Sequence, residues 1–448
     1  MIGQDRSLKH LKAAVKRSNL DQVELLMVAR ESGCTRFANS LIHQNVFEER
    51  VTVFIRTLDH GGVGLTKVPS LEEDMLSEGI RKASETGRRL TPEKGFETFP
   101  APQPYKDVAA FSEETAKFRH LERADRLKDI FAEAATARLR MAGAFTTGAE
   151  EVALVNSNGI EAYHRSTSFE VAFTALSERA SGFACRVGTH IRDLNPQVLA
   201  QEAMGKALAG SEPVVLPPGK YTVILDPKAL AELLEWTSYI AFGARRYQEG
   251  TSFIAGKIGE QIVGEQITLY DDALEPGGFP RPFDYEGVPK HRFDLIRGGK
   301  AAGVVYDTRY GSREGKNSTG HATLPSSEEG PLPLNLYMEP GDRSRDEILS
   351  STERAILITR FHYVNGLLEP EVALMTGMTR DGTFLVEGGV ITHRVEDLRF
   401  TDSVLRILNH VTAISRERES IKSWWSEEGV YTIPAVRVEG MTFTGKTG

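Results

Sequence analysis

The order of apolar and polar residues along the chain predicts a mixture of helices and antiparallel strands. Apolar residues recur every three or four positions over residues 5–18, which is typical of an amphipathic helix. Residues 24–29 and then 36–67 instead predict successive strands, turned by polar residues and by Gly61–Gly62. No regular alternation of strands with helices follows, so the pattern favours an α+β fold over a doubly wound parallel sheet.

Capping and turn residues predict further elements. Asp226 followed by Pro227 predicts the start of a helix that continues to about Gly243, because Asp suits the N-cap and Pro the first helical turn. Asn158–Gly159 predicts a hairpin turn within strands over residues 152–187. The other helices are predicted over residues 70–85, 112–142, 196–208, 251–262 and 401–415, and the other strands over residues 221–225, 371–395, 431–438 and 441–444.

Proline-rich segments divide the chain. The prolines between residues 91 and 105 exclude a regular helix or a central strand, so this segment is expected to cross the surface as a loop. A second such segment, SEPVVLPPGK at residues 211–220, is the best candidate for a domain boundary. We therefore predict an N-terminal domain of helices and antiparallel strand meanders over residues 1–212. A C-terminal, mostly β domain with a pair of helices is predicted over residues 219–448.

Composition limits the classes of function. The 448 residues carry 54 Lys and Arg against 62 Asp and Glu, a formal charge of −8, which argues against broad binding to nucleic acids or anionic membranes. Cys34 and Cys185 are too few for a disulfide framework or a thiolate zinc site, and their strand-like surroundings indicate buried, inert thiols. The first residues lack the apolar core of a signal peptide and no segment is apolar enough to span a bilayer, so we expect a cytoplasmic protein.

The common catalytic motifs are absent or out of context. The closest histidine pairs, His43/His60 and His393/His410, are 17 residues apart, so no helix presents two histidines to a metal on adjacent turns. The segment GMTFTGKT at residues 440–447 matches the phosphate-loop pattern, but we expect a chance match because no helix follows to bind phosphate. No G-x-S-x-G nucleophile motif occurs.

Two further segments each allow two interpretations. The glycine-rich Ser312–His321 loop either exposes backbone amides to a ligand or is an ordinary surface loop. The adjacent indoles of Trp424–Trp425 either mark an interface for a partner or peptide, or place one ring in the core and one under partial cover.

Segments along nearly the whole chain resemble the TldD/PmbA family, bacterial and archaeal proteins once described as modulators of DNA gyrase and now grouped as metallopeptidases. In the N-terminal half the resemblance rests on RFANSLIHQNVFEERVTVFI (36–55) and VALVNSNGIEAYHRST (152–167). In the C-terminal half it rests on PPGKYTVILDP (217–227), NSTGHA (317–322) and the segment from residue 360 to residue 402. The order and spacing of these segments make the resemblance specific.

The resemblance distinguishes two kinds of subunit. In the TldD kind, the helix after the PPGKYTVILDP-like strand carries an H-E-x-x-x-H motif whose histidines bind zinc and whose Glu is the general base, and a Cys near the C-terminus is a further ligand. Aligned without gaps, this chain has Glu235 at the first His, Trp236 at the Glu and Ile240 at the second His. Trp and Ile cannot bind zinc, and no Cys follows Cys185. The chain is therefore identified as a TldE/PmbA-like subunit without metal or catalytic residues, and Glu235 is expected to be a surface or interface charge.

The resemblance implies a subunit of a TldD/TldE-type zinc metallopeptidase that degrades or processes unfolded or leader peptides. Zinc is then supplied by a TldD-type partner in a heterodimer, and the peptide is held in extended form by adding to a sheet edge. The alternative is a homodimer of the same fold that binds a peptide or another ligand without cleaving it. A third hypothesis, activity by a metal-independent or differently coordinated route, needs titratable groups with strongly shifted pKa values in a cavity.

Overall fold

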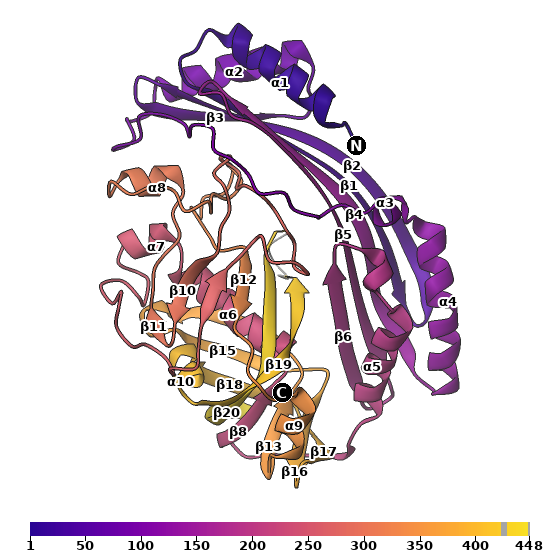
Figure 1. Cartoon of the computed structure of the whole chain (residues 1–448). Helices are drawn as coiled ribbons and strands as arrows, with labels where there is room; N and C mark the ends of the chain where they lie inside the picture. The colour runs from indigo at the N-terminus through magenta and orange to yellow at the C-terminus, as the bar shows by residue number, and fades with distance from the viewer. Residues whose placement is uncertain (423–427, 447–448) are drawn as a thin grey trace.

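Two β-sheets and their helices make up the described part of the chain (Figure 1). The structure, a computed structural model, describes residues 1–422 and 428–446, so the Trp424–Trp425 pair lies outside the described residues. Helices and mostly antiparallel strands share the chain without a regular strand–helix alternation. The predicted α+β class is therefore confirmed.

The N-terminal sheet is antiparallel, with the strand order β3-β2-β1-β4-β5-β6. Its strands are β1 (Val23–Ala38), β2 (Leu41–Asp59), β3 (Gly62–Val68), β4 (Arg140–Asn156), β5 (Glu161–Leu176) and β6 (Ser181–Gly188). The predicted turn at Gly61–Gly62 is confirmed between β2 and β3, and the predicted turn at Asn158–Gly159 is confirmed between β4 and β5.

Helices cover the convex face of this curved sheet (Figure 1). They are α1 (Gln4–Ser18), α2 (Glu73–Gly87), α3 (Glu113–Lys117), α4 (His120–Thr136) and α5 (Pro196–Leu208), together with the 3-10 turn η1 (Ile191–Asp193). Successive side chains of a strand point to opposite faces, and the odd-numbered residues of the long strands face these helices. Leu25 and Met27 pack in the apolar layer with α1 and α2, whereas Phe145 and Phe173 pack in the layer with α4 and α5.

The C-terminal sheet is larger and mixed. Its main path runs β11-β10-β9-β12-β20-β8-β13-β16-β17-β7, and β14, β15, β18 and β19 branch from this path. Its strands are β7 (Ser211–Val214), β8 (Gly219–Leu225), β9 (Leu269–Asp271), β10 (Phe293–Arg297), β11 (Lys300–Ala301), β12 (Asn335–Met338), β13 (Arg354–Ile358), β14 (Phe361–Glu369), β15 (Leu374–Thr379), β16 (Thr383–Glu387), β17 (Val390–Val395), β18 (Leu398–Ser403), β19 (Val411–Lys422) and β20 (Val430–Lys446).

Helix α6 (Pro227–Ala241) is the central helix of the C-terminal half. It begins at the predicted Asp226–Pro227 pair and is buried along nearly its whole length, in contact with β20 and β14. The shorter helices of this half are α7 (Ala244–Gln248), α8 (Thr308–Ser312), α9 (Arg345–Ser350) and α10 (Val404–Asn409), with the 3-10 turn η2 (Pro370–Val372).

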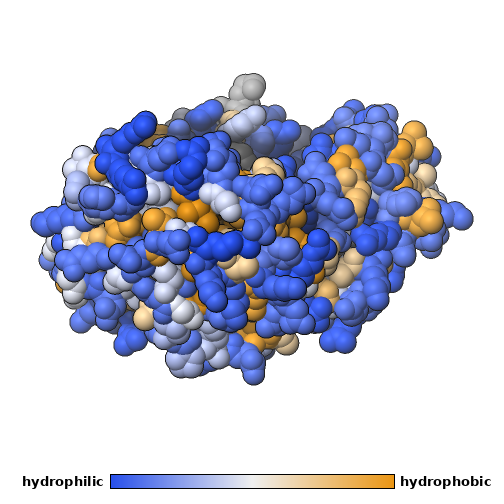
Figure 2. Space-filling view, turned by 90° about the horizontal axis from the view of Figure 1, so that it is seen from above, coloured by the Kyte–Doolittle hydropathy of each residue, from blue (hydrophilic) through white to orange (hydrophobic). Residues whose placement is uncertain are grey.

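The face seen from above is mainly hydrophilic, with apolar residues gathered in separate areas between the polar ones (Figure 2). Among residues 1–422 and 428–446, no helix combines the length and the apolar character that crossing a membrane requires.

The predicted helix over residues 251–262 is wrong. Helix α7 ends at Gln248, and the chain then makes a series of turns. Gly250, Gly256 and Gly259 have φ values of +73°, +74° and +90°, a backbone region that interrupts a right-handed helix.

The structure differs from the predicted elements at three other places. Over residues 401–415 the predicted helix is reduced to α10, because β18 pairs with β15 and β20 before it and β19 pairs with β20 after it. Over residues 112–142 the predicted helix is divided into α3 and α4, and the last residues already belong to β4. The two predicted closing strands are one strand, β20, which continues through a bulge at Gly440.

Arg56 lies in a buried ionic cluster where the two halves meet. Its Nη2 is 2.6 Å from Oε1 of Glu24, on β1, and its Nη1 is 2.9 Å from Oε1 of Glu286, in the loop after β9. Asp284 and Asp307 add two carboxyl groups: burial, and then repulsion by Glu286, raises the pKa of each to about 7. One guanidinium therefore lies within a group of four carboxyl groups, and bound protons offset part of the excess negative charge.

This cluster makes the stability depend on pH near neutrality. The unfolded carboxyl groups titrate near pH 4, so between about pH 4 and pH 7 the folded state binds more protons, and the free energy of unfolding falls as the pH rises through this window. We expect Asp307→Asn, which keeps an acceptor for the Tyr310 amide at the start of α8, to reduce the loss of stability between pH 6.5 and pH 8 by on the order of 1 kcal/mol. Urea unfolding of both proteins across this range measures the difference. If the free energy of unfolding changed equally with pH in the variant and in the original chain, the proton-binding role of Asp307 would be contradicted.

Candidate functional site: a polar pocket between the two halves

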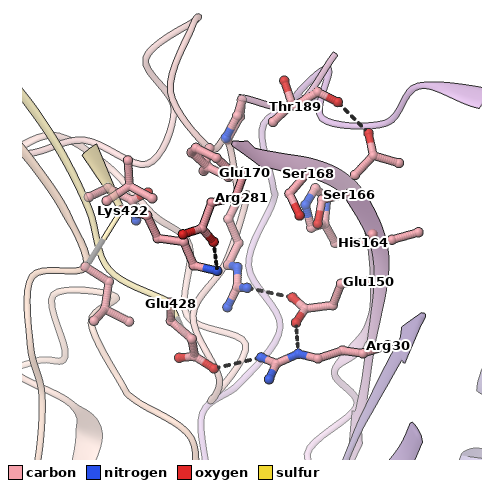
Figure 3. A pocket seen from close by; sticks show the side chains of 18 of the residues that line it. Arg30, Glu150, His164, Ser166, Ser168, Glu170, Thr189, Arg281, Lys422 and Glu428 are labelled. Carbon is pink, nitrogen blue, oxygen red and sulfur yellow. Dashed lines mark hydrogen bonds and ion pairs between the residues drawn. The ribbon is translucent and has the colours of Figure 1, made fainter. Parts of the chain in front are cut away.

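A pocket of about 340 Å³ lies between the concave face of the N-terminal sheet and the loops of the C-terminal half (Figure 3). We call it the interdomain pocket. Strands β1, β2, β4 and β5 supply one wall. The segments around residues 279–290 and 321–335, together with Lys422, Glu428 and Val430, supply the other.

The wall formed by the sheet is polar because polar residues occupy alternate positions of the strands. On β5 the residues His164, Ser166, Ser168 and Glu170 share the face that points to the pocket. The odd-numbered Thr167 and Phe169 also border the pocket, but Phe169 belongs with Val171 and Phe173 to the apolar layer under the helices. The strand period therefore separates a pocket face from a core face.

An ionic network crosses the pocket from one half to the other (Figure 3). Arg30 Nε lies 2.5 Å from Oε2 of Glu150, and Arg30 Nη2 lies 3.0 Å from Oε1 of Glu428. Arg281 Nη2, from the C-terminal half, lies 2.8 Å from the other Glu150 oxygen. Burial acts to raise the pKa of Glu150, but Arg281 and Arg30 outweigh burial and hold this pKa below its usual value. Glu150 is therefore ionised at neutral pH and links two arginines.

His164 is a neutral imidazole on the wall of the pocket. Burial, and then the nearby Arg281 guanidinium, lowers the pKa of His164 to about 4. Its Nε2 is buried and has no hydrogen-bond partner among the described residues. A neutral imidazole nitrogen can donate or accept one hydrogen bond depending on its tautomer, so this atom offers a ligand a polar contact.

Asp271, Lys290 and His321 form a buried group beside this pocket. Lys290 Nζ lies 3.3 Å and His321 Nε2 lies 3.0 Å from Oδ1 of Asp271, and the Asn335 amide donates to Oδ2 at 2.7 Å. Burial raises the pKa of Asp271, but Lys290 and His321 reverse this effect and lower the pKa to about 2. Burial and then Lys290 lower the pKa of His321 to about 4. His321 lines the pocket together with His164, and with their lowered pKa values these are titratable groups of the kind that the third hypothesis requires.

The Ser312–His321 loop reaches the interdomain pocket only at its end. Its first residue closes helix α8, and Arg313 contacts Glu93 at 3.2 Å, away from the pocket lining. His321 and the following Ala322 line the pocket. Sequence reasoning therefore selected one pocket residue through this loop and missed the arginines and carboxylates of the network. The alternation of His164, Ser166 and Ser168 with apolar residues is the signal that could have found the wall.

The three positions of the family's zinc motif lie elsewhere, on α6. Trp236 and Ile240 are buried, and Trp236 Nε1 donates a hydrogen bond of 2.8 Å to the Val364 carbonyl. The ring packs so closely on Gly366 that a Cβ there would lie 2.8 Å from Trp236. Neither side chain has an atom that can bind zinc, so the residues present do not fit the metal. Among the described residues, no group of three His, Cys, Asp or Glu side chains is placed to hold a metal ion.

The expectation that Glu235 is a surface or interface charge is wrong within this chain, because its side chain is 3% exposed. It lies on a helix that other elements cover on nearly all sides. Burial, and then the charge of Glu235, raises the pKa of Tyr431 on β20, so the carboxyl group lies close to that strand.

Together, the curved sheet, the buried α6 and the mixed sheet define a two-part α+β protein. The model of the PmbA/TldA metallopeptidase C-terminal domain matches residues 218–445, and the model of the central domain of the same family matches residues 110–210. The chain belongs to the PmbA/TldD metallopeptidase family.

The chain is also similar to curated proteins and to solved structures. An uncharacterized protein of Methanocaldococcus jannaschii is 28% identical over 272 residues, which are 60% of this chain and 63% of that protein. Metalloprotease PmbA of Escherichia coli O157:H7 is 23% identical over 294 residues, 64% of this chain and 61% of that protein. These alignments thus span less than two thirds of the curated relatives. The crystal structure of TldE from Thermococcus kodakarensis has a TM-score of 0.89 at 20% identity, covering 97% of this chain and all of that chain, and therefore shares the fold.

Proposed function

We propose that this chain is the subunit without zinc in a TldD/TldE-type metallopeptidase complex that degrades or processes unfolded or leader peptides. The observation that carries the proposal is the packing of α6, where Trp236 and Ile240 occupy two zinc-motif positions as buried apolar side chains. In this proposal the TldD-type partner supplies zinc and the general base. This chain supplies an interface and part of the substrate cavity.

The name of the similar structure from Thermococcus kodakarensis, TldE, supports the same proposal. The interdomain pocket supports it as well, because hydroxyl, imidazole and charged groups on two walls offer a polar backbone several hydrogen-bonding partners. We further propose that the complex works in the cytoplasm, without nucleic acid or membrane as a partner.

Reconstitution from two purified proteins tests this proposal. Zinc content and hydrolysis of an unfolded peptide are measured for this chain alone, for a TldD-type protein from the same source alone, and for their mixture. We expect this chain alone to be free of bound zinc and inactive, and the mixture to elute as a complex that cleaves the peptide. Stoichiometric zinc and hydrolysis by this chain alone would overturn the proposal.

A second candidate function is a homodimer that binds a peptide or another ligand without cleaving it. The specific observation in its favour is that the interdomain pocket brings hydroxyl, imidazole and charged side chains from both halves of this chain together, which are groups that a ligand can bind. Peptide binding and a dimeric mass for this chain alone, together with no association with the TldD-type protein, would favour this candidate.

A further inference from the structure

A second cavity, of about 590 Å³, opens on the other face of the N-terminal sheet. It lies where β1, β2 and β4 meet the junction of α3 and α4, the two helices seen along the convex face in Figure 1. Gly33, Phe47 and Thr147, all at odd-numbered positions, are among its lining residues. We call it the convex-face cavity.

Arg123, on α4, is a buried cation in the wall of this cavity, with 3% of its surface exposed. Its Nε donates to Thr35 Oγ1 at 2.8 Å, and its Nη1 donates to Thr147 Oγ1 at 2.7 Å and to the Phe118 carbonyl at 3.2 Å. These acceptors are all neutral. Two of the five guanidinium N–H groups, those of Nη2, have no hydrogen-bond acceptor among the described residues.

No carboxylate of the described residues forms an ion pair with Arg123. The two hydroxyl groups that accept hydrogen bonds from Arg123 also donate one each. Thr35 Oγ1 donates to Asn45 Oδ1 at 2.6 Å, and Thr147 Oγ1 donates to the Phe118 carbonyl at 2.9 Å. Burial lowers the pKa of Arg123, yet a guanidinium stays protonated in proteins. The chain therefore buries a positive charge that no carboxylate of the described residues contacts directly, although the nearby Glu122 carboxylate acts to raise the pKa of Arg123. Such burial is costly unless an anion completes the site.

Gly33 keeps open the space beside this guanidinium. A Cβ at this position would lie 2.8 Å from Nη2 and 2.9 Å from Nη1 of Arg123. A glycine inside a strand weakens the strand, and it often marks a place where another group approaches the backbone closely. Its φ is not in the left-handed region, so the backbone does not require glycine here.

The rest of the lining is suited to an anion attached to an apolar body. The half-exposed ring of Phe47 lies under the Arg119 guanidinium at 5.2 Å, and the first residue of the 17-residue helix α4, His120, also lines the cavity. The amino-terminal end of a helix favours negative charge. Two carboxylates, Glu31 and Glu49, line the cavity as well, and neither forms an ion pair with Arg119 or Arg123.

We propose that the convex-face cavity binds an organic oxyanion, with a carboxylate or phosphate group on Nη2 of Arg123 and an apolar part against Phe47. This site is independent of the peptidase proposal, because Arg123 and Phe47 lie on the opposite face of the sheet from the interdomain pocket and do not line it, although both cavities reach Glu31, Gly148 and Ala149.

Titration of the full chain with benzoate and with phenyl phosphate at constant ionic strength, followed by calorimetry, tests the proposal. We expect saturable binding of at least one probe and weakening by about tenfold or more in Arg123→Met, as expected for loss of a charge-assisted hydrogen bond. Arg126→Met, which removes an exposed arginine of the same helix, is the matched control and should bind as the original chain does.

Gly33→Ala is a second variant that keeps the charge and fills the space beside Nη2. It should weaken probe binding as Arg123→Met does. If Arg123→Met does not fold, the affinity of the Gly33 variant tests the proposal in its place. Benzoate binding alone identifies a carboxylate site, and phenyl phosphate binding alone identifies a phosphate site. Absence of saturable binding of both probes, or equal affinity in the Gly33 variant and the original chain, would overturn the proposal.

Discussion

Replacing Arg56 by methionine should lower the free energy of unfolding by about 3–5 kcal/mol at pH 7, because the change leaves buried carboxylates without their cation. Glu24 and Glu286, both nearly inaccessible to solvent, each lose an ion pair shorter than 3 Å. Burial raises the pKa of Glu24 to about 7, and Arg56 acts against this increase. Without the guanidinium Glu24 binds its proton more tightly, so the loss of stability should grow as the pH rises from 6 to 8. Urea unfolding at several pH values measures both effects.

Arg88→Met is the matched control. Arg88 forms an ion pair of 2.8 Å with Asp59, but its side chain is more than half exposed. Water screens such a pair, so the free energy of unfolding should change by less than about 1 kcal/mol. If the two variants lost similar amounts of unfolding free energy, the Arg56 guanidinium would not be needed to stabilise the carboxyl groups at the junction of the two halves.

Gly64→Ala should destabilise the protein by about 3 kcal/mol or more, because it forces overlap between β3 and α2. A Cβ at residue 64 would lie 1.8 Å from the Ala83 carbonyl oxygen and 2.7 Å from the Gly87 amide. These are backbone atoms of the helix, and they can move only if the helix as a whole leaves the sheet. The temperature of unfolding and the urea midpoint should both fall.

Gly205→Ala tests the same substitution without the overlap. Gly205 lies inside helix α5, and a Cβ there would meet no atom within 4 Å. Alanine has the higher helix propensity, so this variant should be as stable as the original chain or more stable by up to about 1 kcal/mol. A loss of stability in the Gly205 variant equal to that of Gly64→Ala would contradict the steric argument.

The sequence was sufficient to predict the fold class and the elements whose signals are local. The turns at Gly61–Gly62 and Asn158–Gly159 and the start of α6 at Asp226–Pro227 depend on a few adjacent residues, and they are confirmed. The helices over residues 251–262 and 401–415 were predicted wrongly for different reasons. The first is interrupted by glycines with positive φ, and the second is replaced by strands that pair with segments far away in the sequence.

The candidate site was harder to predict because its residues come together only through the fold. Arg30, Glu150 and Arg281 are separated by more than a hundred residues along the chain, and nothing near any one of them indicates the others. His321 was reached only because it lies in a loop of unusual composition. The burial of Glu235 follows from the packing of β14 and β20 around α6, which no pattern within the helix contains.

The two cavities on opposite faces of one sheet have a consequence for how this protein can change during evolution. Insertion or deletion of a single residue in the middle of β5 would exchange the places of Ser166 and Ser168 with those of Thr167 and Phe169 beyond that point. The ring of Phe169 would then turn from the apolar layer toward the interdomain pocket, and polar groups would enter the apolar layer below the helices. New ligand preferences are thus open to the family through point substitutions on alternate residues, while length changes are confined to the loops at the ends of the strands.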